Sequence, residues 1–376
     1  MPAMEFIIFA AMLFGIAVFH RRALEIAAVG SLFLLIYKVF GQGINLADHL
    51  AHESPLLFNL LGLLLGFALL AKQFEQTEVP SWLPQWLPSG WTGGFILLIL
   101  VGVLSTFLDN IAGAMIGGVM ARTVYQNRVT LSYIVAVVAA SNAGGAGSVI
   151  GDTTTTMLWL GGVPATVFFK AFIGSAIAIG FSGVIAARTQ HNFQPIISLS
   201  SKTIKLDRGR LVVVALSMIL TVVGNVAFNA PAAGLWAGIL LGSFIRTTPW
   251  RELQHAYKGA LFLVLLVLSA SLMPVKALPP PSWETAFSLG FLSAVFDNIP
   301  LTALALYQGG YDWGILAFTV GYGGSLIWFG SSAGVAISNM FPLAKNSLQW
   351  IKQGWHVPVA YIFAFFIMLA VAGWKP

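Results

Sequence analysis

Apolar runs long enough to cross a membrane alternate with short polar segments along the whole chain. A spanning helix needs about 20 apolar residues. The first half of the sequence predicts, in order, apolar elements at 4–20, 23–40, 54–73, 92–108, 110–122, 131–162 and 163–187. The second half predicts, in the same order, 210–228, 232–246, 257–277, 283–296, 299–309, 312–342 and 355–374. The match of element to element indicates one structural unit used twice.

One pair of short apolar elements in each half is too short to cross a membrane twice. The stretch at about 92–122 holds roughly 30 residues, whereas two crossings need about 40. Its second arm, starting at Asp109, extends about 20 Å as a helix, which is part of the way through a core of about 30 Å. This stretch and its equivalent at about 283–309 therefore predict re-entrant hairpins with an Asp-Asn pair at each tip. The longer runs at about 131–162 and 312–342 predict helices broken in the middle.

The predicted fold is an all-α integral membrane protein with two inverted repeats. Each repeat has three helices, a re-entrant hairpin, a discontinuous helix and a final helix, and its odd number of crossings inverts the second repeat relative to the first. The first repeat covers 1–187, a cytoplasmic linker covers 188–209, and the second repeat covers 210–376. Two pairs of similar segments support the repeat: Phe107–Ile111 with Phe296–Ile299, and Gly144–Gly151 with Gly323–Gly330.

The composition agrees with a membrane protein and excludes several kinds of site. The chain is 58% hydrophobic and 9% charged, with a mean hydropathy of +0.86, whereas soluble domains carry about 25% charged residues. The absence of cysteine excludes disulfides, thiolate metal sites and cysteine nucleophiles. No nucleophile–base pair or metal-ligand spacing of His and Glu is visible, so we expect neither an enzyme nor a cofactor.

The placement of the basic residues predicts the orientation. The net charge is +6, which in a membrane protein reflects topology rather than nucleic acid binding. With the helices given above, most Lys and Arg residues fall on one side, and only Lys38, Lys276 and Lys375 fall on the other. The positive-inside rule then predicts that both termini are extracytoplasmic and that the first hairpin enters from the cytoplasm. Lys170 lies within a predicted helix, where we expect its amine to reach the membrane interface rather than to pair.

Polar residues at membrane depth are the candidates for function. The segment Ser141–Met157 interrupts an apolar run with glycines, one carboxylate and several hydroxyls. Irregular backbone at this depth is stable only where it is buried in protein or lines a wet cavity, and an ionisable residue there indicates a functional site. The carboxylates are Asp109 and Asp297, each followed by an asparagine (Asn110, Asn298), and Asp152. Together they could replace the hydration shell of a small cation, although Asp and Asn also cap helices.

Asp152 is the sharpest candidate because its counterpart in the second repeat is Ser331. An unpaired buried carboxylate favours its protonated form, whereas a bound cation favours the ionised form. Sodium ions and protons would then compete for one group, which is the minimum that an exchanger needs. Thr154 and Thr155 could add hydroxyl ligands, or could bond back to the carbonyl one turn earlier. The candidates in the second half are Ser293, Ser325, Ser331 and Ser332.

These segments resemble the NhaD-type sodium/proton antiporters, which belong to the ion-transporter superfamily of arsenite pumps and divalent-anion/sodium symporters. The resemblance is carried by Asn142–Trp159, Phe107–Asn110, Gly323–Ser325 and Gly330–Val335. It implies inverted repeats, a homodimer held by a scaffold domain, and alternating access of the elevator type. It also implies an ion site at or near Asp109, Asn110, Asn142, Asp152, Thr154, Thr155, Ser293 and Asn298. Such antiporters carry a further acidic residue one turn before the hairpin Asp-Asn pair, and here that position is Ser105.

The leading hypothesis is a secondary transporter that exchanges sodium or lithium for protons, with Asp109 and Asp152 as sodium ligands. We expect it in the inner (plasma) membrane of a prokaryote, with the lipid bilayer and a second copy of the chain as partners and no nucleic acid. One alternative is a sodium-coupled di- or tricarboxylate or oxyanion transporter, in which the hairpin helix N-termini hold the anion. A second alternative is a non-transporting membrane scaffold, which leaves the duplicated hairpins unexplained.

Overall fold

The computed structural model describes residues 4–19, 22–197 and 204–376, and all regular elements in these ranges are helices. The helices of the first half are α1 (Met4–Val18), α2 (Ala23–Ile36), α3 (Leu46–Glu75), α4 (Val79–Trp82), α5 (Trp91–Phe107), α6 (Asn110–Val124), α7 (Leu131–Gly145), α8 (Thr153–Leu160) and α9 (Ala171–Phe193). Those of the second half are α10 (Arg208–Phe228), α11 (Pro231–Gly242), α12 (Leu253–Ser271), α13 (Trp283–Ser293), α14 (Asn298–Gln308), α15 (Trp313–Gly323), α16 (Ser332–Met340), α17 (Ser347–Gln353) and α18 (His356–Ala372).

The protein is an all-helical integral membrane protein, which confirms the predicted fold class. Among the described residues, five helices are long and apolar enough to cross a membrane, or six if the bent pair α17 and α18 counts as one span. Helices α5 and α6 are separated only by Leu108 and Asp109, as expected for a hairpin, and α7 and α8 are separated by residues 146–152. The same order recurs at α13 and α14 and at α15 and α16. The inversion of the two halves and their boundaries stay predictions.

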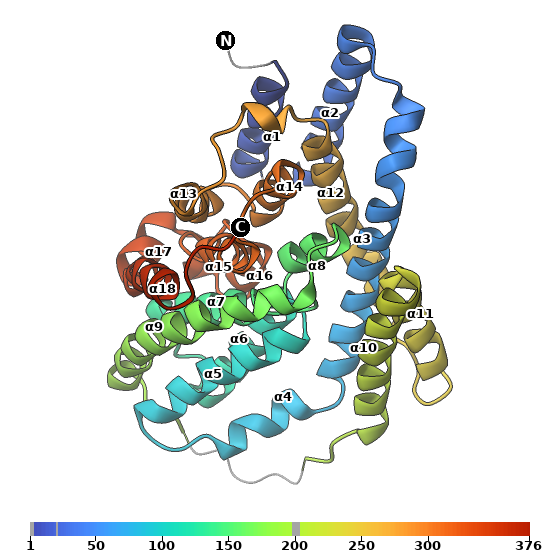
Figure 1. Cartoon of the computed structure of the whole chain (residues 1–376). Coiled ribbons are helices and arrows are strands. Elements are labelled where there is room, and N and C mark those ends of the chain that lie inside the picture. Colours follow the sequence, from blue (N-terminus) through green and yellow to red (C-terminus); the bar gives the residue numbers. More distant parts are fainter. Residues whose placement is uncertain (1–3, 20–21, 198–203) are drawn as a thin grey trace.

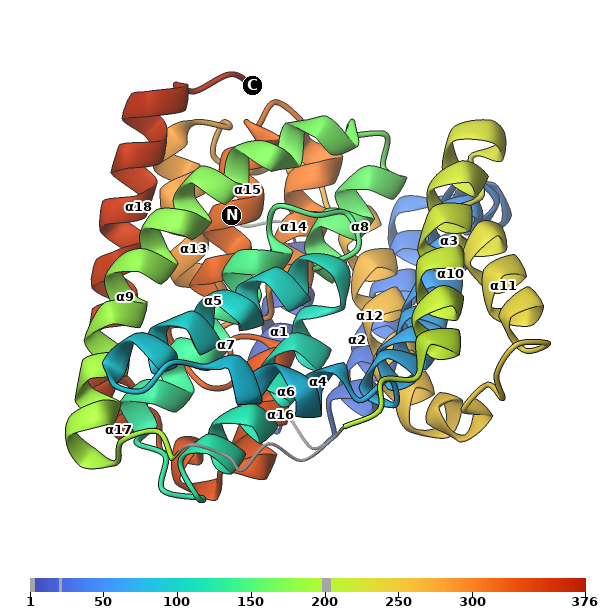
Figure 2. The ribbon, with the colours of Figure 1, turned by 90° about the horizontal axis from the view of Figure 1, so that it is seen from below.

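The helices form two groups (Figures 1 and 2). The first, which we call the scaffold bundle, contains α1–α3 and α10–α12, with α3 packed against α11 and α12. The second, the core bundle, contains α5–α9 and α13–α18, with α7 packed between α5 and α9 and with α9 against α18. The hairpins and broken helices therefore lie together in the core bundle, and α14 and α8 extend from it toward the scaffold bundle (Figure 1).

Close backbone contact determines where α7 can lie. A Cβ atom on Gly144 would be 1.9 Å from the carbonyl oxygen of Gly102 in α5, so a larger residue would separate the two helices. The helix-breaking segment that follows is thereby held against the first hairpin rather than exposed to lipid, as irregular backbone in a membrane requires.

Helix α9 continues to Phe193, beyond the predicted start of the linker at residue 188. The reason is a buried side chain. Gln190 accepts a hydrogen bond from the backbone N–H of Thr130 (2.7 Å) and donates one to the carbonyl oxygen of Arg128 (2.9 Å). These contacts fix the last turns of α9 against the start of α7. Residues 198–203 of the predicted linker lie outside the described residues.

Candidate functional site

Three aspartates cap the starts of helices, two at the hairpin tips and one at the first helix break. The capping role considered in the sequence analysis is therefore confirmed. Asp109 caps α6 by accepting a hydrogen bond from the N–H of Ile111 (2.7 Å), and Asp297 caps α14 in the same way. Asp152 caps α8 through Oδ1, which accepts from the N–H of Thr154 (3.0 Å). A cap uses one carboxylate oxygen, and the second oxygen remains available for other chemistry.

The second oxygen of Asp152 is the exceptional atom of the site. The side chain is 1% exposed, and Oδ1 also accepts a long hydrogen bond from the amide of Asn298 (3.4 Å). Within the described residues, neither Asp152 Oδ2 nor the neighbouring Thr154 hydroxyl has a hydrogen-bond partner. Buried polar atoms are almost always paired, so an unpaired carboxylate oxygen and an unpaired hydroxyl two residues apart in the same cap indicate a place for a ligand.

Asn142 holds the two halves of the core bundle together. Its amide nitrogen donates to the hydroxyls of Ser325 (2.9 Å) and Ser331 (3.0 Å) beside the second helix break. Its amide oxygen accepts from Asn110 at the tip of the first hairpin (3.1 Å). Three predicted elements, the first hairpin and both breaks, thus meet at one buried side chain.

The two breaks pack on their hairpins in the same way. In the first half Gly144 lies close to the backbone of Gly102 and Gly151 close to that of Ser105; in the second half Gly323 lies close to Gly290, and Gly330 close to Ala294 and Ser293. By this correspondence, Asn142 is equivalent to Gly321, and Asp152 is equivalent to Ser331. The contact between Asn142 and Ser331 therefore matches the contact between Gly321 and Asp152. In the first pair, the Asn142 amide donates a hydrogen bond to the Ser331 hydroxyl. In the second pair, the position opposite the unpaired carboxylate oxygen is a glycine, which carries no side chain to bond to it.

Gly321 is a position beside the candidate site that the sequence analysis did not single out. A Cβ atom placed there would be 3.1 Å from Asp152 Oδ2 and 3.8 Å from the backbone carbonyl oxygen of Asn142. The position beside Gly321 therefore faces a carboxylate oxygen and a carbonyl oxygen, which are ligands that hard cations prefer, together with the Ala146 Cβ at 3.4 Å. The signal was available in the sequence, because the repeat alignment places glycine opposite Asn142.

The remaining predicted residues divide into two groups. The Thr155 hydroxyl donates to the carbonyl oxygens of Ser148 (2.5 Å) and Asp152 (2.8 Å), so the back-bonding interpretation holds for it. The Ser293 hydroxyl donates to the carbonyl oxygen of Val320 (2.7 Å). Both threonine and serine therefore fix the backbone around the breaks. Ser332, at the start of α16, faces the cavity described next.

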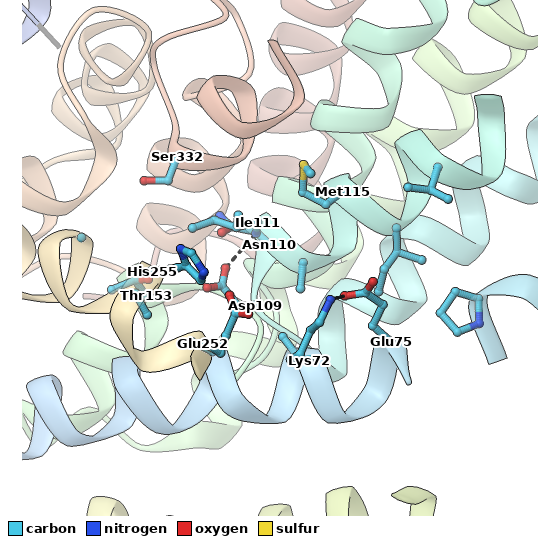
Figure 3. A pocket seen from close by; sticks show the side chains of 18 of the residues that line it. Lys72, Glu75, Asp109, Asn110, Ile111, Met115, Thr153, Glu252, His255 and Ser332 are labelled. Carbon is cyan, nitrogen blue, oxygen red and sulfur yellow. Dashed lines mark hydrogen bonds and ion pairs between the residues drawn. The ribbon is translucent and has the colours of Figure 1, made fainter. Parts of the chain in front are cut away.

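A cavity of about 1040 Å³ reaches the site between α3, α6 and α12 (Figure 3). Of the predicted residues, Asp109, Asn110, Asp152, Asn298 and Ser332 line it. Its other charged or titratable lining residues, in the described part of the chain, are Lys72, Glu75, Glu78, Glu252 and His255. Five carboxyl groups thus face one lysine, and that lysine is paired with Glu75 (2.6 Å). In a chain with a net charge of +6, the cavity wall is acidic.

The prediction that Lys170 is unpaired was wrong. Its amine pairs with the carboxylate of Asp312, and also donates to the carbonyl oxygen of Gly373 (2.5 Å). Asp312 caps the start of α15 through its other oxygen, which accepts from the N–H of Ile315 (3.2 Å). The pair lies at the end of α15 opposite Gly321, and it therefore does not neutralise Asp152.

Comparison with known proteins identifies related transporters. A family model described as "Citrate transporter" (CitMHS) matches residues 6–323. The chain is 28% identical over 354 residues to "Sodium/proton antiporter 1" of Arabidopsis thaliana, covering 79% of this chain and 58% of that protein. It is 27% identical over 306 residues to "Na(+)/H(+) antiporter NhaD" of Vibrio parahaemolyticus, covering 66% of this chain and 72% of that protein. A third relative, NhaD of Vibrio cholerae, is 29% identical over 258 residues, covering 54% of this chain and 53% of that protein.

These comparisons confirm the resemblance to NhaD-type antiporters. The chain spans between about half and three quarters of the length of these three relatives. The relatives are named as transporters of sodium and protons, and none of these three names describes an enzyme.

Proposed function

The chain belongs to the citrate transporter family, and we propose that it exchanges sodium (or lithium) ions for protons across a membrane. The observation that carries the proposal is the unpaired Oδ2 atom of Asp152, which faces the space left by Gly321. The names of the related antiporters support it. Sodium is the cargo, and the exchange uses no resident cofactor and no covalent chemistry.

Asp152 is the group for which the two cargoes compete. A cation in the space beside Oδ2 can reach the Asn142 carbonyl oxygen and the unpaired Thr154 hydroxyl, and its charge stabilises the ionised carboxylate. Without the cation, a desolvated carboxylate favours its protonated form, because in the described part of the chain no Lys or Arg pairs with it. Asn298 holds Oδ1 in both forms. One group that takes either a proton or a cation couples the two movements.

The charge of the cavity favours a cation over a carboxylate substrate. Five carboxyl groups and one paired lysine line it, and like charges close together cost free energy in a cavity with low-dielectric walls. The alternative of a sodium-coupled di- or tricarboxylate transporter is favoured by the family description and by a volume larger than one cation needs. The acidic wall makes this the second candidate.

The wider organisation belongs to the same proposal. The matching contacts of the two breaks and hairpins support two inverted repeats that move as one core bundle against the scaffold bundle. Asp109, Asn110, Asn142, Thr154, Thr155, Ser293, Ser325, Ser331, Ser332, Asp297 and Asn298 form or support the ion site. We further propose a homodimer in a prokaryotic plasma membrane, with both termini outside the cytoplasm.

The test is cation-driven proton movement in everted membrane vesicles that contain a pH-sensitive dye. Sodium, lithium and potassium are added in turn, followed by citrate and succinate. We expect sodium or lithium to move protons in the wild type, and Asp152→Asn to abolish the signal. Asparagine also caps helices, so α8 should still form. The matched control is Glu284→Gln, which removes an exposed carboxylate in α13 and should leave exchange unchanged.

Two results would contradict the proposal. Undiminished sodium-driven proton movement in Asp152→Asn would exclude Asp152 as the shared site. Proton movement driven by citrate or succinate, and by no cation alone, would establish the carboxylate transporter instead.

A further inference from the structure

Helix α3 contacts the cavity along only part of its length. The residues of α3 that line the cavity are Leu64, Ala68, Ala71, Lys72 and Glu75, all in its second half. Its first half carries Glu53, which is 6% exposed. At 1.5 Å per residue, Glu53 lies about 28 Å from Lys72 along the helix axis. The half of α3 that does not line the cavity therefore carries its own buried carboxylate.

Glu53 is bonded to the second hairpin. Its Oε2 atom accepts a hydrogen bond of 2.6 Å from the hydroxyl of Tyr307, near the end of α14. In the described part of the chain no Lys or Arg forms an ion pair with Glu53. One turn before it, His49 bonds to the Ser271 hydroxyl at the end of α12 (2.9 Å). A charged group in a membrane protein is costly unless it is bonded, so this contact between the scaffold and the core bundle calls for an explanation.

The two hairpins differ in how closely they pack against the scaffold bundle. Helix α14 packs directly on α12, and its Ile299 and Ala303 share one apolar cluster with Leu266 and Val267 of α12. The corresponding arm of the first hairpin, α6, is separated from α3 by the cavity, which both helices line. The cavity that reaches Asp152 is thus open between α3, α6 and the first half of α12, and it ends where α14 packs on the second half of α12.

We propose that Glu53 and Tyr307 form the latch of the closed gate, on the side of the membrane opposite the cavity. The bond joins the outer rim of the scaffold bundle to the hairpin arm that must separate from it when the site opens to that side. The apolar contact between α12 and α14 excludes water, and the single charged hydrogen bond at its edge sets how readily the arm leaves. The proposal rests on the transport function given above, since only a transporter needs both openings.

The absence of cysteine from the natural chain allows a direct test by labelling. Ala303→Cys places a thiol one turn before Tyr307, at a fully buried position in the contact with α12. A membrane-impermeant maleimide is then applied to purified protein in proteoliposomes, from each side separately. In the otherwise unchanged protein the thiol should react slowly from the side opposite the cavity.

We expect Tyr307→Phe and Glu53→Gln, each combined with Ala303→Cys, to increase that labelling rate about tenfold, the factor that loss of a hydrogen bond to a charged group represents. The matched control is Tyr311→Phe, which removes a buried hydroxyl bonded to Gln308 within the same end of the hairpin. It should leave the labelling rate unchanged.

Equal labelling rates in Tyr307→Phe and Tyr311→Phe would overturn the latch, whether both rise or neither does. Tyr307→Phe keeps the ring and decides the question even if Glu53→Gln does not fold. The measurement requires no ion movement, so a failed latch is distinguishable from a failed antiport assignment, which the Asp152→Asn vesicle assay tests.

Discussion

A single methyl group at Gly321 tests the site beside Asp152 without removing a polar atom. In Gly321→Ala the new Cβ would lie 3.1 Å from Asp152 Oδ2 and 3.4 Å from the Ala146 Cβ. Gly321 lies inside α15, where alanine is more favourable than glycine by about 1 kcal/mol. The crowding requires the neighbours of the new Cβ to move by a few tenths of an ångström, and the gain in helix propensity acts against that cost. The variant should therefore fold.

Gly321→Ala should weaken the binding of the cation. Oxygen ligands lie about 2.3–2.6 Å from a hard cation such as calcium, and sodium is of similar size. A cation bound to Oδ2 in this space would collide with the methyl group. We expect the sodium concentration for half-maximal exchange to rise at least tenfold, which corresponds to about 1.4 kcal/mol of binding free energy.

The assay is sodium-driven proton movement in everted vesicles across a range of sodium concentrations. Gly180→Ala is the matched control, because no heavy atom would lie within 4 Å of its Cβ, and it should leave the sodium dependence unchanged. If Gly321→Ala binds sodium as the wild type does, the cation does not lie beside Gly321 and the proposed position of the site is wrong.

Three further predictions concern stability. Lys170→Met should cost about 3–5 kcal/mol by leaving Asp312 buried without its charged partner, although the backbone N–H groups of Ile315 and Lys375 still donate to it. It should lower the unfolding temperature in detergent more than the double variant with Asp312→Asn does. Hydrogen bonds from Arg246 hold the pKa of Asp207 below its usual range. The ionised carboxylate therefore contributes fully to the free energy of unfolding above about pH 4, and this contribution is lost as the pH falls through the lowered pKa. Asp207→Asn should remove that part of the acid-unfolding curve. Asn142→Ala should lower the unfolding temperature, since each buried hydroxyl left without its donor costs about 1–3 kcal/mol; an unchanged temperature would show that the amide does not hold the core bundle together.

The sequence alone determined the class of protein and the order of its elements. Apolar runs of membrane length have few other stable forms, and short pairs with a central Asp-Asn could be recognised as hairpins by length. Asp152 could be chosen because a carboxylate and glycines at membrane depth conflict with a lipid-facing helix. Helix capping depends on residues next to one another in the sequence, so it can be predicted without the tertiary structure. Asp109, Asp152 and Asp297 all occur where helices start.

The tertiary structure alone decided which polar groups are paired. Lys170 finds a partner 142 residues away, and Asn142 bonds to hydroxyls 183 and 189 residues away. Glu53 bonds to a tyrosine 254 residues away. Such pairs depend on how distant helices pack, which periodicity does not encode. The same physics leaves one oxygen of Asp152 unpaired. The carboxylate was visible in the sequence, but the space beside it exists only because Gly321 packs where its counterpart carries an amide.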